Sequence, residues 1–322
     1  MNKQTRSART EKAELHPRNR HRGAYDFQSL IAACPELAPF VAVNKYQTES
    51  IDFSNAVAVK MLNRALLASF YDVSDWDIPP GYLCPPVPGR ADYVHQAADL
   101  LASSNKGVIP IGNKIRVLDI GIGANAIYPL IGHKEYGWSF VGTDIDPAAI
   151  ASVEKMLLSN PSLSKDISCR LQKNKASIFG GVLQQGESFD LTLSNPPFHS
   201  SLAEAQAGTE RKWKNLGFEK KKAGNLNFGG YQNELWCEGG EQAFIGRMIE
   251  ESAGISERCF WFSSLVSKSE SLRGIYKALK KAGAAQVRTI DMAQGQKTSR
   301  FVAWSFLNPS RRTEWQIRRW NG

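Results

Sequence analysis

The fold of this chain is decided by nine residues, VLDIGIGAN at positions 117–125. An apolar run that ends in closely spaced glycines is typical of a buried strand followed by a turn in which the backbone can approach a ligand closely. About twenty residues further on, a second predicted strand ends in Gly142-Thr143-Asp144, which places a carboxylate beside the end of the first strand, where it can accept both hydroxyls of a ribose. The two segments together predict a cofactor site of the nucleotide type.

The chain around this segment alternates predicted strands and helices, which is the signature of a mostly parallel sheet covered on both faces. The predicted strands are Arg116–Ile120, Ser139–Asp144, Ile167–Leu171, Asp190–Ser194, Cys259–Leu265, Gln286–Asp291 and Phe301–Phe306. The predicted helices are Ile127–Ile131, Pro147–Ser159, Glu241–Ala253 and Ser269–Lys281. We therefore expect an α/β domain over residues 106–322, with a seven-stranded, mostly parallel sheet.

A helical N-terminal subdomain is expected over residues 23–105. Apolar residues at helical spacing predict helices at Phe27–Ala33, Asn55–Phe70 and Ala91–Leu101, with an extended, proline-rich connection over Pro79–Pro88. Residues 1–22 are rich in Lys and Arg and short of apolar side chains, so they cannot bury enough surface to order themselves. We predict that they form a basic flexible arm, either a solubilising tail or a contact for phosphates.

The charge of the chain favours an anionic partner. Its 322 residues contain 40 Lys and Arg against 31 Asp and Glu, a net charge of +9 at pH 7. Such a surface suits nucleic acid. The five cysteines are widely spaced and form no C-x-x-C pair, so neither a disulfide framework nor a metal site is expected. With no long apolar run and no targeting segment, we expect a cytoplasmic, non-membrane protein, and a monomer.

A dinucleotide-dependent enzyme is the main alternative for the cofactor site, because Gly121, Gly123 and Ala126 also satisfy the loose G-x-G-x-x-G/A pattern. However, Asp119 stands directly before the glycines, where its charge would repel a pyrophosphate and attract the amino acid moiety of a cationic sulfonium cofactor. Pro129 lies early in the following helix, which makes that helix a poor phosphate-binding element. The pattern therefore favours S-adenosylmethionine over NAD.

The motif Ser194-Asn195-Pro196-Pro197-Phe198 ends the fourth predicted strand, at the edge where ligands bind in open α/β folds. An exocyclic amino group is a poor nucleophile because its lone pair is delocalised, and acceptors aimed at its hydrogens hold that lone pair toward a methyl donor. Asn195 supplies a side-chain carbonyl, and Pro196 a backbone carbonyl that Pro197 holds rigid. Phe198 offers a flat face for a flipped-out base, and such stacking contributes about 1–3 kcal/mol. Although Asn-Pro-Pro also fits an ordinary strand-to-turn connection, its place in this series of motifs predicts a catalytic acceptor site that needs no general base.

Residues 200–240 form a long segment without clear periodicity, and loops of this length are usually functional or disordered. Basic residues there are interleaved with aromatic ones, which suits a surface that pairs phosphates and stacks unpaired bases. We predict an RNA-binding insertion, with a merely solvated insert as the alternative. The predicted RNA-binding residues are Arg211, Lys212, Lys214, Lys220, Lys221 and Lys222.

Taken together, these motifs resemble the class I amino-methyltransferases, and more closely the RlmF-type ribosomal RNA adenine-N6 methyltransferases with their eukaryotic METTL-type relatives. The resemblance covers nearly the whole chain. Besides the cofactor strand and the Asn195 motif, it rests on LHPRN at 15–19, CPPVPGRADY at 84–93, EGGE at 238–241 and AWSF at 303–306.

The resemblance implies a Rossmann-like methyltransferase fold and roles for single residues. Arg90 would reach the carboxylate of S-adenosylmethionine, Asp144 would hold its ribose, and the Asn195 motif would receive adenine. A surface salt bridge for Arg90 and a helix cap for Asp144 are the alternatives. The predicted cofactor-binding residues are Arg90, Asp119, Gly121, Gly123, Asn125 and Asp144. Two departures are visible: Asn125 stands where many methyltransferases have a third glycine, and Ala124 narrows the turn.

These observations predict an enzyme that transfers a methyl group from S-adenosylmethionine to the exocyclic N6 of an adenine in 23S ribosomal RNA. Guanine-N2 methylation of ribosomal RNA is the nearest alternative, because Asn-Pro-Pro-Phe-His also resembles enzymes of that kind. Two alternatives come from other classes: an RNA-binding module with an inactive cofactor pocket, and an NAD-dependent enzyme.

Overall fold

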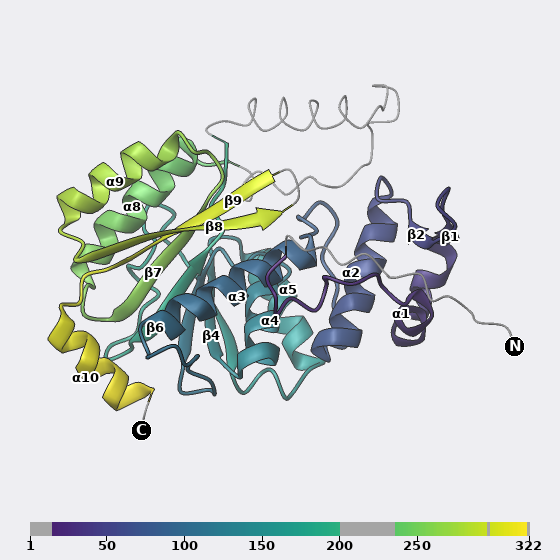
Figure 1. Ribbon diagram of the computed structural model, residues 1–322, viewed down its shortest axis with the longest axis horizontal. Helices are drawn as coiled ribbons and strands as arrows, with labels where there is room; N and C mark the ends of the chain where they lie inside the picture. Colours follow the sequence, from purple (N-terminus) through teal and green to yellow (C-terminus); the bar gives the residue numbers. More distant parts are fainter. Residues whose placement is uncertain (1–14, 200–235, 295–296, 321–322) are drawn as a thin grey trace, which may run out of the picture.

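The computed structural model describes residues 15–199, 236–294 and 297–320. Its main feature is a seven-stranded sheet of order β5-β4-β3-β6-β7-β9-β8 (Figure 1). The strands β3 to β7 run parallel to one another, and β9 is antiparallel to both β7 and β8. This confirms the predicted α/β class and the mostly parallel sheet. The strands are β3 Arg116–Ile120, β4 Ser139–Asp144, β5 Ile167–Leu171, β6 Phe189–Ser194, β7 Cys259–Val266, β8 Gln286–Gln294 and β9 Lys297–Ser305.

Helices cover both faces of the sheet, because successive strand residues point to opposite sides and both sides are apolar. In β3, Val117 belongs to a core shared with α3, α4, α5 and α10, whereas Leu118 belongs to a second core shared with α8 and α9. The helices are α3 Val87–Ser103, α4 Ile127–Tyr136, α5 Pro147–Leu158, α8 Gly240–Gly254, α9 Ser271–Ala282 and α10 Pro309–Arg319. The sequence did not predict α10.

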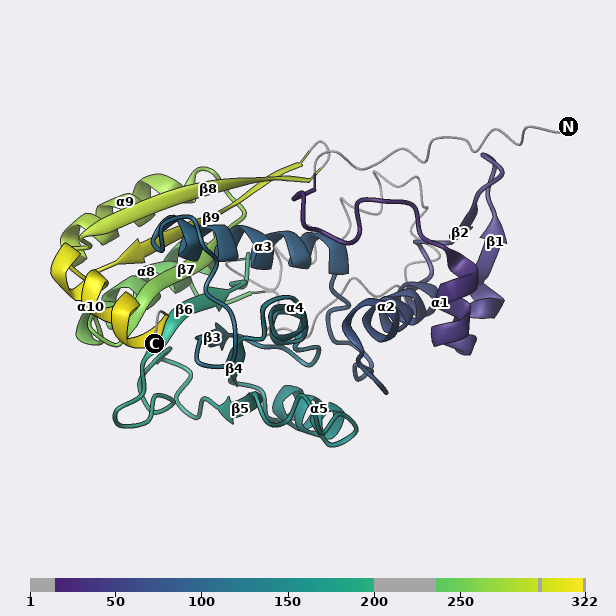
Figure 2. The same cartoon turned by 60° about the horizontal axis from the view of Figure 1, so that its bottom comes forward.

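The N-terminal elements lie together at one end of the molecule (Figures 1 and 2). They are α1 Phe27–Ala33, the 3-10 helix η1 Pro35–Phe40, the hairpin strands β1 Val41–Val43 and β2 Glu49–Ile51, and α2 Ala56–Tyr71. Their buried side chains are continuous with the core on the α3 side of the sheet. The short hairpin was not predicted, because three-residue strands carry too little alternation to be recognised.

Helix α3 begins earlier than predicted. It starts at Val87, so the extended connection expected over Pro79–Pro88 ends before Pro88. Proline is tolerated in the first turn of a helix, where its missing N–H would have no intrahelical partner. As a result, Arg90 is a helical residue in the first turns of α3.

The flexible arm predicted for residues 1–22 is wrong from Leu15 onward; residues 1–14 lie outside the described residues. Asn19 is 3% exposed, and its side-chain amide donates to Pro88 O at 2.9 Å and to Asp92 Oδ1 at 2.6 Å. Arg18 donates to Asp99 at 2.6 Å. This segment packs on α3 chiefly through polar groups, a source of order that apolar composition does not reveal.

Candidate active site

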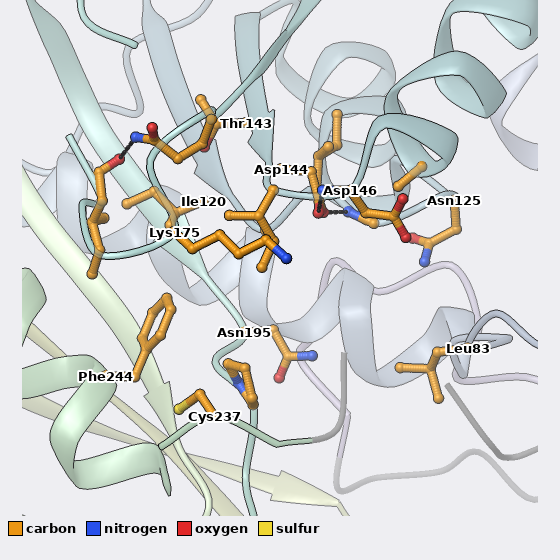
Figure 3. A pocket seen from close by; sticks show the side chains of 18 of the residues that line it. Leu83, Ile120, Asn125, Thr143, Asp144, Asp146, Lys175, Asn195, Cys237 and Phe244 are labelled. Carbon is orange, nitrogen blue, oxygen red and sulfur yellow. Dashed lines mark hydrogen bonds between the residues drawn. The ribbon is translucent and has the colours of Figure 1, made fainter. Parts of the chain in front are cut away.

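The carboxyl ends of β3 and β6 are direct neighbours. The two strands pair in parallel with Ile120 opposite Ser194, and Ser194 Oγ donates to Ile120 O at 3.3 Å. The next residue in each strand, Gly121 and Asn195 respectively, therefore starts from the same edge of the sheet. Both line one cavity of about 370 Å³ (Figure 3).

Most of the predicted catalytic and cofactor-binding residues line this cavity. Those that do are Arg90, Gly121, Gly123, Asn125, Asp144, Asn195 and Pro197. Asp119, Pro196 and Phe198 are not among the lining residues; Asp119 is fully buried behind the turn. Asp144, Asp146 and Asn125 lie together at one end of the cavity, Cys237 and Phe244 at the other, and Asn195 between them (Figure 3).

The glycine-rich turn depends on backbone conformations that favour glycine. Gly121 has φ 75° and Gly123 has φ 63°, both in the left-handed region. The N–H groups of Gly121 and Ile122 both donate to Thr143 O at 2.9 Å, which holds the turn against the end of β4. A Cβ added to Gly121 would meet no atom within 4 Å, so the space above this residue is open to a ligand.

Asn125 has a structural task at the position where a third glycine was expected. Its side-chain oxygen accepts the N–H of Ile127, the first residue of α4, at 3.1 Å. Its backbone carbonyl accepts Trp76 Nε1 at 2.9 Å. The departure from the glycine pattern is therefore explained by a helix start that is held from the N-terminal part of the chain.

Asp144 is held by the turn that it faces. Its Oδ2 accepts the N–H of Gly123 at 2.9 Å, and its Oδ1 accepts the N–H of Asp146 at 3.0 Å. Burial raises the pKa of Asp144, although these backbone N–H groups oppose the shift. Beside it, Tyr82 donates to Asp146 Oδ2 at 2.6 Å. Both carboxylates line the cavity, where their remaining acceptor capacity suits the hydroxyls of a ribose.

Asp119 is a buried carboxylate, and in the described part of the chain neither of its oxygens has a hydrogen-bond partner. Burial, then the negative charge of Asp144, raises its pKa to about 8, and the charge of Arg90 partly opposes this. Arg90 itself donates to Tyr128 Oη at 2.9 Å and lines the cavity. An orphaned acid below the turn and a guanidinium at its side match the ammonium and carboxylate of an amino acid moiety, so these residues fit S-adenosylmethionine.

The end of β6 is rigid where Asn195 leaves it. Ser194 N donates to Tyr93 Oη at 3.5 Å, and that hydroxyl is 2.8 Å from Ser263 Oγ of β7. Asn195 Oδ1 is buried and has no hydrogen-bond partner within residues 15–199, 236–294 and 297–320. A lone acceptor at the mouth of a braced strand is suited to receive an N–H donor from a ligand.

Sequence reasoning missed several residues of this cavity. They follow strand β5, come just before α8, or lie on α8: Gln172, Lys175, Trp236, Cys237, Phe244 and Arg247. Gln172 follows β5 directly, so the rule that ligands bind at the carboxyl ends of strands would have found it. Phe244 and Arg247 are three residues apart in α8 and share one helix face, a pattern that also arises from packing alone.

The EGGE segment of residues 238–241, which is part of the family resemblance, has a structural explanation at Glu241. This buried carboxylate accepts the N–H groups of Ser267 and Lys268, the latter at 3.0 Å, and the hydroxyl of Ser271 at 3.2 Å. It fastens the start of α8 to the loop that follows β7. Glu238, by contrast, lines the cavity.

Three further predictions concern RNA binding, metal binding and membrane association. The predicted RNA-binding residues from Arg211 to Lys222 lie outside the described residues. Within residues 15–199, 236–294 and 297–320, no group of three or more His, Cys, Asp or Glu side chains could hold a metal ion. In the same ranges, no helix combines the length and apolar character needed to cross a bilayer.

Comparison with known proteins places the chain in a family. The family model described as "RNA methyltransferase" matches residues 9–308. The protein named ribosomal RNA large subunit methyltransferase F from Photobacterium profundum is 55% identical over 327 residues, 97% of each chain. Its namesake from Pseudomonas putida strain GB-1 is 57% identical over 312 residues, 96% of this chain and 98% of the relative.

Solved structures agree. The catalytic domain of human METTL16 in complex with MAT2A 3′UTR hairpin 1 has a TM-score of 0.76 and 29% identity, covering 92% of this chain and 96% of that one. The N-terminal domain of human METTL16 in complex with SAH has a TM-score of 0.70 and 28% identity, covering 91% and 99%. With a fold, a cavity and relatives that agree, this chain belongs to the RNA methyltransferase family that the matching model describes.

Proposed function

We propose that this protein transfers a methyl group from S-adenosylmethionine to the exocyclic N6 of an adenine in 23S ribosomal RNA. One observation carries the proposal: the carboxyl ends of β3 and β6 open into one cavity, so that Gly121 and Asn195 face a shared space. A methyl donor over the first and an amine held by the second would be neighbours there.

The cofactor half of the cavity is formed by the turn after β3 and the end of β4. Asp144 would accept the ribose hydroxyls, Arg90 would bind the carboxylate, and Asp119 would balance the ammonium group. When bound, S-adenosylmethionine supplies a methyl group that its sulfonium already activates. The open backbone at Gly121 leaves room for this ligand to lie close to the turn.

The acceptor half is formed by the Asn195 motif. The unpartnered Oδ1 of Asn195 would accept one N–H of the target amine, and the carbonyl of Pro196 the other. These two bonds keep the amine lone pair out of conjugation and directed into the cavity. Phe198, the last residue of the motif, is half-buried, and we propose that the flipped-out base stacks on it.

The net charge of the chain and the names of its relatives support an RNA substrate. The net charge of +9 favours a polyanion. The relatives at 55–57% identity are named as large-subunit ribosomal RNA methyltransferases, and METTL16 has been solved with an RNA hairpin. We further propose that Arg211, Lys212, Lys214, Lys220, Lys221 and Lys222 contact this RNA, and that the protein acts as a monomer.

The variant Asn195→Ala tests the proposal. It should lower kcat on ribosomal RNA by about a hundredfold or more while the Kd for S-adenosylhomocysteine changes less than about twofold, because the side chain acts on the acceptor and not on the cofactor. Asn113→Ala is the matched control, since this exposed asparagine contacts Asp166 at 3.2 Å ahead of β3. Unchanged kcat in Asn195→Ala would remove the mechanism.

Mass analysis of the nucleosides released from the methylated RNA identifies the acceptor. N6-methyladenosine is the expected product. N2-methylguanosine would replace the proposed base, and the absence of any methylated nucleoside would favour a binding module with an inactive pocket.

A further inference from the structure

Three polar atoms in the acceptor half of the cavity have no hydrogen-bond partner among the residues that the structure describes. They are one acceptor, Asn195 Oδ1, and two donors, Trp236 Nε1 and Arg247 Nε, each buried at the atom. All three residues line the cavity that holds Gly121. Buried N–H and C=O groups in folded proteins are nearly always paired, so three orphans in one cavity indicate a ligand that pairs them.

The backbone brings Trp236 beside the Asn195 motif. Trp236 forms a parallel bridge with His199, and Cys237 N donates to His199 O at 3.1 Å. His199 follows Phe198 directly, so this bridge places the indole next to the predicted base site. Trp236 is therefore positioned by the motif itself.

Arg247 reaches the same place from α8. It lies one helical turn after Phe244, which lies near Cys237 and Asn195 in Figure 3. Burial raises the pKa of the Cys237 thiol and the charge of Arg247 lowers it, which is a sign of the closeness of the two side chains. Within the part of the chain that the structure describes, Arg247 forms no ion pair. Its guanidinium is a donor without an acceptor, in contrast to Arg90.

A set of one acceptor and two donors distinguishes two purines. In adenine, the N6 amine is flanked by N1 and N7, and both ring nitrogens accept hydrogen bonds. In guanine, the N2 amine is flanked by N3, an acceptor, and by N1–H, a donor that would be buried against another donor. Such a mismatch is strongly unfavourable in a site built to hydrogen-bond its substrate.

We propose that Trp236 and Arg247 determine base specificity, by donating to the two ring nitrogens that flank the amine bound by Asn195, so that the site accepts adenine and rejects guanine. The inference rests on the proposed function and adds to it the residues that choose the base. A phosphate contact by Arg247 is the competing explanation, and it makes a different prediction because a phosphate is the same in every nucleotide.

Modified RNA distinguishes contacts to the ring nitrogens from a phosphate contact. We would use a short synthetic RNA that copies the mapped methylation site, with adenosine, 1-deazaadenosine or 7-deazaadenosine at the target. Each analogue replaces one ring nitrogen by C–H and leaves the amine in place. Wild-type kcat/KM should fall by about ten- to a hundredfold with each analogue, the loss expected for one buried bond to a strong donor.

The variants Trp236→Phe and Arg247→Met should each lose a similar factor with adenosine. Each should then show no further loss with the analogue that lacks its own partner nitrogen, while it stays sensitive to the other analogue. Arg311→Met is the matched control, because Arg311 lies on α10 and pairs with Glu314 at 3.1 Å. It should behave as the wild type with all three RNAs.

Equal wild-type rates on all three RNAs would overturn the proposal without any variant. It would also fail if the loss in each variant simply multiplied the loss from each analogue, the result that a phosphate contact predicts. If instead no RNA with a natural base is methylated, the proposed function fails first, so the two failures are distinguishable.

Discussion

Binding of the cofactor should release a proton from Asp119. In the cofactor-free protein, burial and the charge of Asp144 raise the pKa of this carboxyl to about 8, so at pH 7 it is mostly protonated. An ammonium group placed beside it favours the ionised form and lowers the pKa again. We therefore expect proton release on binding, and an affinity for S-adenosylhomocysteine that rises between pH 6 and 8.

The magnitude follows from the pKa. At pH 7 a carboxyl with a pKa of about 8 is about nine-tenths protonated, so up to about 0.9 proton should leave for each ligand bound. Because pH 7 lies about one unit below this pKa, ionising Asp119 at pH 7 costs about 1.4 kcal/mol. Binding at pH 7 should therefore be roughly tenfold weaker than binding well above pH 8.

Calorimetry in two buffers of different ionisation enthalpy measures the protons released. Titration with S-adenosylhomocysteine keeps the amino acid moiety and removes the sulfonium, so the result reports on the ammonium group. The variant Asp119→Asn is the control, since it lacks the carboxyl that titrates but leaves proton exchange by the ligand itself unchanged. The reasoning is refuted if the wild type and Asp119→Asn release the same number of protons, or if affinity does not depend on pH in this range.

Three further predictions concern stability and RNA binding. Because the pKa of Asp119 is raised from 3.8 to about 8, the cofactor-free protein should lose stability as the pH rises from about 4 to 8, and thermal unfolding of Asp119→Asn should show a shallower decline. Asn19→Ala removes both bonds to Pro88 and Asp92 and should lower the free energy of unfolding by about 1–3 kcal/mol in urea; no change would mean that residues 15–22 do not support α3. Replacing Lys220, Lys221 and Lys222 by Gln should reduce the slope of log Kd for RNA against log salt by about 2, and an unchanged slope would make this run a solvated surface.

The bounds of the parallel strands were more predictable than those of the antiparallel strand β9. The bounds of β3, β4 and β5 agree with the sequence prediction to the residue. Buried parallel strands are short apolar runs between clear turn residues, and this signal is local. For β9 the prediction began four residues late, at Phe301 instead of Lys297, because polar residues open the strand where the hairpin with β8 continues past the sheet.

The C-terminal helix shows why local signals fail. Its side chains are mostly polar, and only Arg312 and Trp315 of α10 are buried. Asp190, fully buried at the start of β6, accepts Trp315 Nε1 at 2.7 Å and Arg319 Nε at 3.0 Å. A helix that packs one apolar side chain, Trp315, into the core and is otherwise held by hydrogen bonds to distant residues has no apolar stripe to reveal it.

In the candidate site, too, residues with a local sequence signal were predictable, and residues placed by long-range packing were not. In the cofactor half, the residues after β3 and β4 were predictable because they follow two strands within a span of about thirty residues, and the glycine and acid positions have a local physical reason. Arg90, on α3, was identified only from the family resemblance. The acceptor half was predictable only at the Asn195 motif. Trp236 and Arg247 reach it through the bridge to His199 and the packing of α8, and no spacing in the sequence encodes such pairings.

The residues that position methyl transfer and the residues proposed to select the base lie on different parts of the fold. The methyl donor and the amine acceptor are positioned by two neighbouring strands in one register, Ile120 opposite Ser194, so their separation is a property of the sheet and not of a loop. The proposed base-selecting donors lie instead on a bridge and a helix face outside that register. Changes there can alter which base is accepted while the distance over which the methyl group moves stays the same. Base choice and transfer geometry are therefore separable, and substitutions at Trp236 and Arg247 should change the first without disturbing cofactor binding.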